Sequence, residues 1–301
     1  MDAQHMLVRI YLFVCQRWRS RLQATAQRQS NNSNPAFTDE EVLTVYLFGI
    51  IKKRRTITEI YDYIADHFSE WFPEMPSSEM PSYQGYNRRL CRLSVVFAPL
   101  AREALAEVDG EATRREAVRI ADSVPIMMAK QKCSSQASVA SEFADKGYCS
   151  SKGVFFYGVK LHVVAGRRPG TMPLPRRAGL TPGSENDLTA LRQALPEIEG
   201  GELYGDKAYC DGPMKERLAQ EQNLTVLTPV KKKKGQNRLS AADKLFSEAV
   251  SRVRQPIESL FNWIDEKTGI QCASKVRSYR GLLVHAFGRL AAAMLLLAFN
   301  S

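Results

Sequence analysis

The stretch LYGDKAYCD, residues 203–211, decides how the C-terminal part of this chain is interpreted. A short apolar run ends at Gly205, and the charged pair Asp206 and Lys207 follows at once. A carboxylate directly after a strand either begins a turn or holds a ligand at the strand end. The second interpretation requires that other parts of the chain supply ligand-binding residues beside Asp206, whereas the first does not.

Segments with strand and helix patterns alternate on both sides of this stretch. GVFFYGVKLHVVAG, for example, alternates and is rich in β-branched and aromatic residues, as in a strand. The predicted strands are 116–128, 153–166, 171–183, 201–206 and 224–230, and the predicted helices are 185–195, 212–222, about 241–267 and about 279–299. This order predicts an α/β fold with an RNase H-like mixed five-stranded sheet flanked by helices.

Three carboxylates occupy the positions that such a sheet brings together. The middle of the first strand holds Asp122, the end of the fourth holds Asp206, and the long helix after the last strand holds Glu258. Three clustered carboxylates repel one another. A pair of divalent cations about 3.5–4 Å apart removes that repulsion and suits phosphodiester cleavage. Oxygen ligands favour Mg²⁺, for which Mn²⁺ substitutes.

Each acid also has a simpler interpretation. Asp122 can cap a turn before Pro125, and Asp206 can cap a turn or helix after its strand. Glu258 follows Arg254 by four residues, which predicts a helical salt bridge. Asp187 is a fourth acid near the expected site, but it also fits the first turn of a helix. Only the joint placement of the three acids favours a metal site.

The first 112 residues predict an all-helical N-terminal domain. Thr38 and Glu41 have the spacing of a capping box at the start of one helix. Basic clusters at 52–55 and at 88–92, the latter containing Arg88 and Arg89, fit a helix-turn-helix DNA reader. A packing or dimerisation domain with solvated arginines fits the same pattern. The predicted domains are therefore 1–112, for DNA binding, and 113–301, for catalysis.

Charge points to a polyanionic partner. The net charge is +10, and residues 1–112 carry 13 Lys and Arg against 14 Asp and Glu, whereas 113–301 carry 29 against 18. The excess of positive charge is therefore located in the domain that is predicted to contain the sheet. Lys231, Lys232, Lys233 and Lys234 form a run that either follows DNA phosphates or is a solvated loop. The scattered cysteines and the absence of a long apolar run or cleavage site predict a cytoplasmic protein.

An ordered set of motifs resembles a known family. DKAYCD at 206–211 and RQPIESLFNWIDEKTGIQ at 254–271 resemble the DDE signature of bacterial insertion-sequence transposases. FTDEEVLTVYLFG at 37–49, PSYQGYNRRL at 81–90, ADSVPI at 121–126 and the segment 257–293 resemble the insertion-sequence 982 family in particular. The resemblance extends over about residues 37–298.

The resemblance implies specific roles. Asp122, Asp206 and Glu258 correspond to the catalytic, metal-binding triad, while Lys207 and Arg254 correspond to basic residues near DNA phosphates. The broader pattern has a Tyr and a Lys where this chain has Ser251 and Asp265, so it departs from that pattern at both positions. The residue Lys267 lies two positions beyond the expected lysine.

The implied activity is a Mg²⁺-dependent DDE transposase that generates a 3′-OH at the element end and transfers it to target DNA. Its implied partners are double-stranded DNA with terminal inverted repeats, target DNA, and a second copy of the chain on DNA. Two alternatives stay open at this stage. One is a metal-dependent nuclease without strand transfer, and the other is a catalytically inactive DNA-binding protein.

Overall fold

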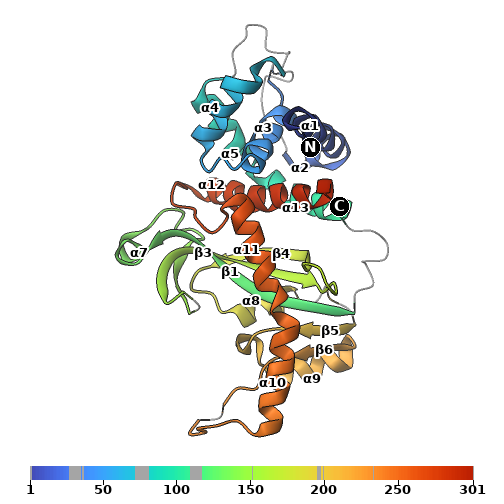
Figure 1. Cartoon of the computed structure of the whole chain (residues 1–301). Coiled ribbons are helices and arrows are strands. Elements are labelled where there is room, and N and C mark those ends of the chain that lie inside the picture. Colours follow the sequence, from blue (N-terminus) through green and yellow to red (C-terminus); the bar gives the residue numbers. More distant parts are fainter. Residues whose placement is uncertain are drawn as a thin grey trace. The chain divides into compact units, whose positions relative to one another are not determined.

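A computed structural model describes residues 2–26, 35, 37–71, 81–108, 117–150, 152–194, 198, 200–232 and 234–300. The chain forms two compact units (Figure 1). One contains Met1–Val108 together with Ile264–Ser301, and the other contains Asp109–Trp263. The predicted domains are 1–112 and 113–301. In the structure, 264–301 instead groups with the N-terminal helices.

The first unit is helical. Helix α3 is its centre, because the side chains along its length are buried on every side, and the predicted capping box of Thr38 and Glu41 begins it. Helix α13 packs against α3 and α6, and the Tyr46 hydroxyl donates to the Val284 carbonyl at 3.1 Å. Its helices are α1 (Ala3–Arg17), α2 (Gln23–Ala26), α3 (Asp39–Ile51), α4 (Ile57–Phe68), α5 (Tyr83–Arg92), α6 (Phe97–Val108), α12 (Tyr279–Leu283) and α13 (Arg289–Asn300).

The predicted helix at 279–299 is continuous but changes form in its middle. A π-helical turn, Val284–Gly288, separates α12 from α13. The segment Tyr279–Phe299 is long and apolar enough to cross a membrane by length and composition alone, but 67% of its most apolar window is buried inside the protein. It is therefore the core helix that the sequence predicted.

The second unit is a mixed sheet. The fold class is as predicted, an α/β sheet flanked by helices and compatible with an RNase H-like fold, but the sheet has six strands instead of five. The additional strand is β2. It pairs with the first half of one edge of β3, and β4 pairs with the second half of the same edge. The strand order is β2-β3-β1-β5-β6, with β4 also on β3. The strands are β1 (Val118–Lys130), β2 (Asp145–Cys149), β3 (Val154–Gly166), β4 (Leu174–Pro182), β5 (Gly201–Tyr204) and β6 (Leu224–Leu227).

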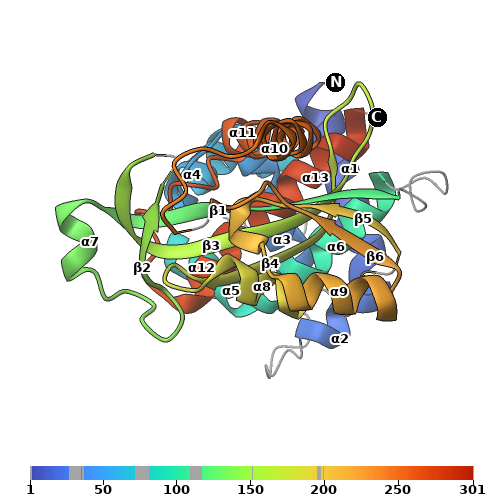
Figure 2. The ribbon, with the colours of Figure 1, turned by 90° about the horizontal axis from the view of Figure 1, so that it is seen from below.

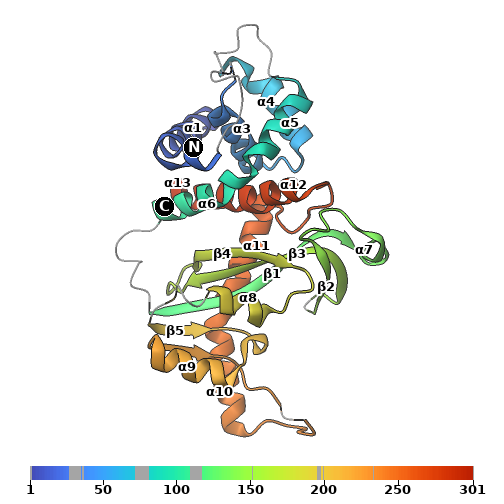
Figure 3. The same ribbon diagram turned by 180° about the vertical axis from the view of Figure 1, so that it is seen from behind.

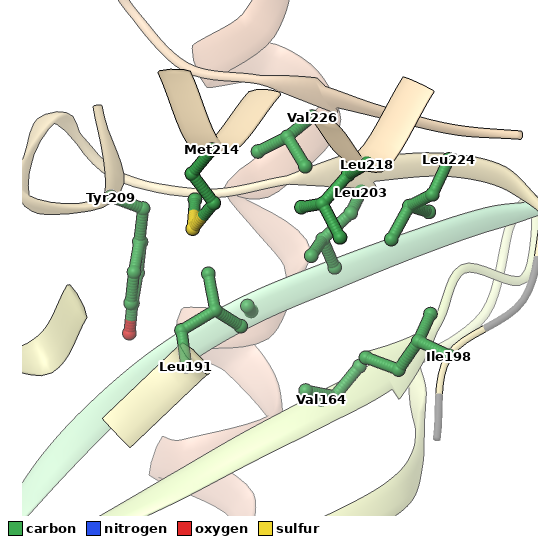
Figure 4. Packing of buried hydrophobic residues seen from close by; sticks show 10 residues of the cluster. Val164, Leu191, Ile198, Leu203, Tyr209, Met214, Leu218, Leu224 and Val226 are labelled. Carbon is green, nitrogen blue, oxygen red and sulfur yellow. The ribbon is translucent and has the colours of Figure 1, made fainter. Parts of the chain in front are cut away.

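Helices cover both faces of this sheet (Figures 2 and 3). On one face, α8 and α9 bury Leu191, Met214 and Leu218 against Leu203 and Val226 (Figure 4). On the other face lies α10, which contacts β1 and β5. The helices of this unit are α7 (Lys132–Gln136), α8 (Asp187–Ala194), α9 (Gly212–Glu221) and α10 (Ala241–Arg254), and α11 (Pro256–Thr268) contains the boundary between the two units.

The long helix predicted over 241–267 is in fact two helices. The break falls at Gln255, directly before Pro256 begins α11. Proline has no N–H to donate and clashes with the preceding turn, so a helix ends or kinks where it occurs. Glu258 therefore lies in the first turn of a new helix, one turn after Arg254 at the end of α10.

Candidate active site

The strand register brings two of the predicted acids together. Strands β1 and β5 are parallel, and the pairing ends at Ile120 opposite Tyr204. Asp122 and Asp206 each follow this pair by two positions, so the register places them side by side at the carboxyl end of β5. Ala121 points into the core beneath α8 and α9. Because side chains alternate along a strand, Asp122 points to the opposite face, where α10 lies.

Both acids also cap local backbone, as the simpler interpretation predicted. The Asp122 carboxylate accepts the Ser123 N–H at 2.8 Å. The Asp206 carboxylate accepts the Lys207 N–H at 2.6 Å and begins a short 3₁₀ turn, Lys207–Tyr209. Each contact uses one carboxylate oxygen, so capping fixes the side chains without occupying all their lone pairs.

The electrostatic environment of Asp122 is unfavourable to its negative charge. The pKa of Asp122 is raised from 3.8 to about 6, mainly by burial; the charges of Asp206 and Asp187 also raise it, while Arg254 and the Ser123 N–H lower it. A carboxylate held in this way is stabilised by any additional cation. The site therefore has a deficit of positive charge.

Arg254 joins Asp122 to the third acid. One guanidinium nitrogen, Nη1, lies 2.5 Å from Asp122 Oδ2, and the other, Nη2, lies 3.3 Å from Glu258 Oε1. The Arg254 and Asp122 side chains are 19% and 20% exposed, whereas that of Glu258 is 58% exposed. The predicted helical salt bridge of Glu258 is thus present, and the same arginine ties Glu258 to the strand acid.

Two of the three predicted acids are suited to hold a metal ion. Asp122 and Asp206 fit a hard cation, since they offer oxygen ligands at a place short of positive charge. Glu258 does not complete the set in this conformation: no three His, Cys, Asp or Glu side chains of the described residues lie close enough to hold a metal ion. The Arg254 guanidinium lies between Asp122 and Glu258 and supplies the positive charge there.

A groove of about 500 Å³ opens beside these residues. Its walls come from the residues after β5 and β6 and from helices α10 and α11. Three of the residues proposed from sequence line it, namely Lys207, Arg254 and Glu258. Lys244 and Arg252, which sequence reasoning missed, add positive charge to the same groove. A basic groove that leads to acids is suited to a phosphate backbone.

A partly buried lysine, Lys160, adds a positive charge beside the acids. The Lys160 ammonium, in the middle of β3, donates to Asp187 at 3.0 Å and to the Glu185 carbonyl at 2.8 Å. Asp187 is thus both the predicted first-turn acid of α8 and a charge that Asp122 experiences. The sequence contained a signal for this contact. Lys160 lies in the middle of a mostly apolar strand, and a lysine at such a position needs a carboxylate partner.

His162 lies in β3 and contacts β4, so its role is structural. Burial is the main cause that lowers its pKa from 6.5 to about 4, and its ring Nε2 lies 2.7 Å from the Thr181 hydroxyl. Tyr209, in the DKAYCD motif, is 2% exposed and packs in the core shown in Figure 4. Its ring is not available to stack on a DNA base, because the short turn after Asp206 points the ring inward.

The other predicted DNA contacts have mixed surroundings. Lys231, Lys232 and Lys234 are exposed, and Lys232 donates to the Asn237 carbonyl at 3.0 Å. Lys233 lies outside the described residues. In the helical unit, Arg88 is exposed, whereas the guanidinium of Arg89 forms an ion pair with Asp39 at 2.5 Å and donates to the Phe37 carbonyl.

The two positions that depart from the family pattern also have local partners. The Ser251 hydroxyl donates to the Ser247 carbonyl at 2.8 Å. The Asp265 carboxylate accepts the Gln271 N–H at 2.9 Å, and the Lys267 ammonium lies 2.8 Å from the Glu266 carboxylate. Asp265 and Lys267 belong to the helical unit.

A mixed sheet flanked by helices, with acids at the carboxyl ends of neighbouring parallel strands, defines the class of RNase H-like α/β domains. The family model of the transposase DDE domain matches residues 112–278, more than half of the chain. The chain belongs to this family and is a DDE transposase, a DNA-binding polynucleotidyl transferase or nuclease that acts in DNA recombination. The comparisons with curated proteins and with solved structures gave no match.

Proposed function

We propose that this transposase cuts and joins the ends of a bacterial insertion sequence of the 982 family, with Asp122, Asp206 and Glu258 as its catalytic acids. The observation that supports this proposal is the register of β1 and β5, which aligns Asp122 with Asp206 while Arg254 connects Asp122 to Glu258. The sequence motifs at 37–49 and 81–90 support the narrower family assignment.

The three acids would hold Mg²⁺, or Mn²⁺ in its place. When bound, a pair of such ions activates the attacking oxygen and stabilises the leaving oxygen of the phosphodiester. The register of β1 and β5, extended by two positions, aligns Asp122 with Asp206, and the raised pKa of Asp122, caused mainly by burial, supports a preference for additional positive charge there. Glu258, whose side chain is more than half exposed, joins them when Arg254 releases it.

Arg254 and Lys207 would contact the phosphates next to the cleaved bond. A phosphate oxygen competes with Glu258 for the Arg254 guanidinium, because both are acceptors of charge-assisted hydrogen bonds. DNA that enters the groove would in this way free Glu258 while Arg254 stays near Asp122. The Arg254 contact with Glu258, at 3.3 Å, is longer than its contact with Asp122, at 2.5 Å. This difference supports the exchange, because the longer contact is the one that the phosphate would replace.

The remaining basic residues would hold DNA farther from the reacting bond. Asp206 and Glu258 are separated by 52 positions, and α9, β6 and α10 take up most of this interval. The contacts with flanking DNA would therefore come from the lysine run at 231–234, from the N-terminal helices that carry Arg88, or from a second subunit. Joining two element ends requires two active sites, which favours a homodimer on DNA.

A cleavage assay on labelled DNA that carries the repeats flanking the gene tests the proposal. Wild type, Asp206→Ala and the control Glu221→Ala, which removes an exposed acid of the same unit, are run with Mg²⁺, Mn²⁺ or EDTA. We expect cleavage at the repeat boundary and joined products from wild type and the control. Asp206→Ala and EDTA should each lower the rate by about 10³-fold or more, a loss of several kcal/mol.

Two other results would change the assignment. Cleavage without joined products would leave a metal-dependent nuclease. Binding without cleavage, identical in wild type and Asp206→Ala, would leave a catalytically inactive DNA-binding protein.

A further inference from the structure

Strands β2 and β3 present two exposed aromatic rings far from the acid cluster. Tyr148 lies opposite Phe155 in the antiparallel register, and their ring centroids are 4.8 Å apart at an angle of 48°. The two residues are 53% and 66% exposed. Aromatic residues usually bury most of their surface, so an exposed pair on a sheet is a candidate contact surface for another molecule.

Tyr148 and Phe155 lie just beyond the part of this sheet face that another segment of the chain covers. Tyr157 is the next residue of β3 on the same face, yet it is only 4% exposed, and its hydroxyl donates to the Val139 carbonyl at 3.1 Å. The segment after α7 therefore covers the face as far as Tyr157. On the opposite face, Phe156 packs with Met127 and Cys149 in a small core. The strands that carry the pair are thus anchored from behind.

Lysines lie around the two rings. Lys146 is exposed and points to the same face as Tyr148, two positions later in β2. Lys130 and Lys132, both exposed, flank Gln131, whose backbone N–H donates to the Phe155 carbonyl at 2.9 Å. The exposed acids nearby are Glu142 and Asp145, and Asp145 accepts the Lys146 backbone N–H at 2.7 Å.

We propose that Tyr148 and Phe155 form a base-stacking contact for DNA, with the lysines beside them binding the phosphates of the same strand. Every base has a π-face, so paired aromatic rings in a basic setting suit unpaired or distorted DNA. A partner protein surface would favour fewer lysines, because lysine is depleted at protein interfaces. This inference rests on the DNA binding of the transposase and adds a second point of contact.

The sheet fixes how far this contact lies from the acids. Lys130 follows Asp122 by eight positions in β1, which is roughly 27 Å at about 3.4 Å per residue. Bases of one DNA strand are spaced by about 3.4 Å. A strand whose phosphodiester lies at Asp122 therefore reaches the aromatic pair after about eight nucleotides.

The test measures binding alone, in EDTA, so that it does not depend on catalysis. Fluorescence anisotropy gives the Kd for a labelled single-stranded oligonucleotide of about 16 nucleotides and for the matching duplex. The variants are the double substitution Tyr148→Ala with Phe155→Ala, the ring-preserving Tyr148→Phe, and the control Val95→Ala, an exposed apolar residue of the helical unit. A 2-aminopurine base, moved along the strand, reports stacking by quenching of its fluorescence.

We expect the double variant to weaken single-strand binding by about tenfold or more and duplex binding by less, since each stacked base contributes at least that order. Tyr148→Phe and Val95→Ala should bind like wild type. In DNA that ends in a repeat, quenching in wild type should be strongest about eight nucleotides from the end. The double variant should lose this quenching but retain its circular dichroism spectrum and its Tm.

Two results would overturn the proposal. In the first, the double variant binds both DNAs as wild type does. In the second, sedimentation shows that it has lost self-association while DNA affinity is unchanged, which would make the rings a subunit interface. Asp206→Ala separates this inference from the proposed function, because that variant should keep the binding and lose only cleavage.

Discussion

Each unit contains a guanidinium that is shielded from solvent, but the two arginines have different partners. Arg289 in the helical unit is 5% exposed, and it donates to the backbone carbonyls of Thr268 and Arg55 and to His285 Nδ1. Arg254 in the sheet unit faces two carboxylates, and its Nε is buried with no hydrogen-bond partner among the described residues. The backbone carbonyls that bind Arg289 are fixed by the fold. A carboxylate side chain such as that of Glu258 can instead move away from its arginine when a substrate group binds there.

The partners explain what each arginine does. Thr268 ends α11, and Gly269 follows with φ +68°, the left-handed conformation that glycine adopts at helix ends. Arg289 satisfies a carbonyl that this helix end leaves without an intrahelical partner. Arg254 instead neutralises the two carboxylates of Asp122 and Glu258. The first arrangement stabilises the fold, and in the proposed function the second holds the acids in a state that substrate changes.

The largest expected effect on stability comes from Arg289→Met. The substitution removes the donor to one buried and one partly buried carbonyl, so we expect the free energy of unfolding to fall by about 3 kcal/mol. Urea denaturation measures it, with Arg102→Met, on an exposed face of α6, as the control. A loss below that of the control would show that the carbonyls find other donors, and the contrast between the two arginines would disappear.

The pH dependence of stability should differ between Asp122→Asn and wild type without metal. Since the pKa of Asp122 is raised to about 6 from 3.8, its protonation stabilises the fold fully below about pH 4, and this contribution is lost as pH rises through about 6. Asp122→Asn should therefore be more stable than wild type by about 2 kcal/mol at pH 7 and equal to it near pH 4.

His285 contributes with the opposite sign. Burial and the Arg289 charge lower its pKa from 6.5 to about 3, so its contribution is present above about pH 6.5 and is lost as pH falls toward 3. Because both proteins contain His285, this contribution cancels in their difference. A difference between Asp122→Asn and wild type that grows toward low pH would contradict the environment described for Asp122.

Arg254→Gln should strengthen metal binding in the absence of DNA by about tenfold, since it removes a cation that competes for Asp122 and Glu258. Titration of Mn²⁺ followed by electron paramagnetic resonance measures the Kd. Arg252→Gln, in the same groove, is the matched control and should leave the Kd unchanged. Weaker binding in Arg254→Gln would mean that Arg254 positions the acids for metal and does not compete with it.

The smallest effect is expected from the exposed lysines. Replacing Lys231 and Lys232 by Gln should lower the slope of log K against log salt by about 2, because each phosphate contact contributes about 0.9. DNA binding at several salt concentrations measures this slope, with Arg217→Gln on α9 as the control. An unchanged slope would favour the alternative that the lysine run is a solvated loop.

Much of the sheet could be predicted from the sequence because strands and helices have different periods. The segment 153–166 has the alternation of a strand, and it forms β3 with bounds that differ by one residue. Strand β2 was missed, because five residues that include Gly147 and three polar or charged side chains carry no usable alternation. Gly147 is needed there, since a Cβ at that position would lie 2.5 Å from the Gly183 carbonyl oxygen.

The sequence by itself predicted which acids are candidates for chemistry, Asp122, Asp206 and Glu258, and the order of strands and helices that places the first two at neighbouring strand ends. These predictions were possible because the strand pattern, the motifs and the four-residue spacing of Arg254 and Glu258 are local. Only the tertiary structure decided that Arg254 also holds Asp122, that Lys160 balances Asp187, and that Tyr209 is buried. Those pairings join residues far apart in the chain or depend on the direction of a turn, and the free energy that selects them comes from burial and charge, which no short sequence window contains.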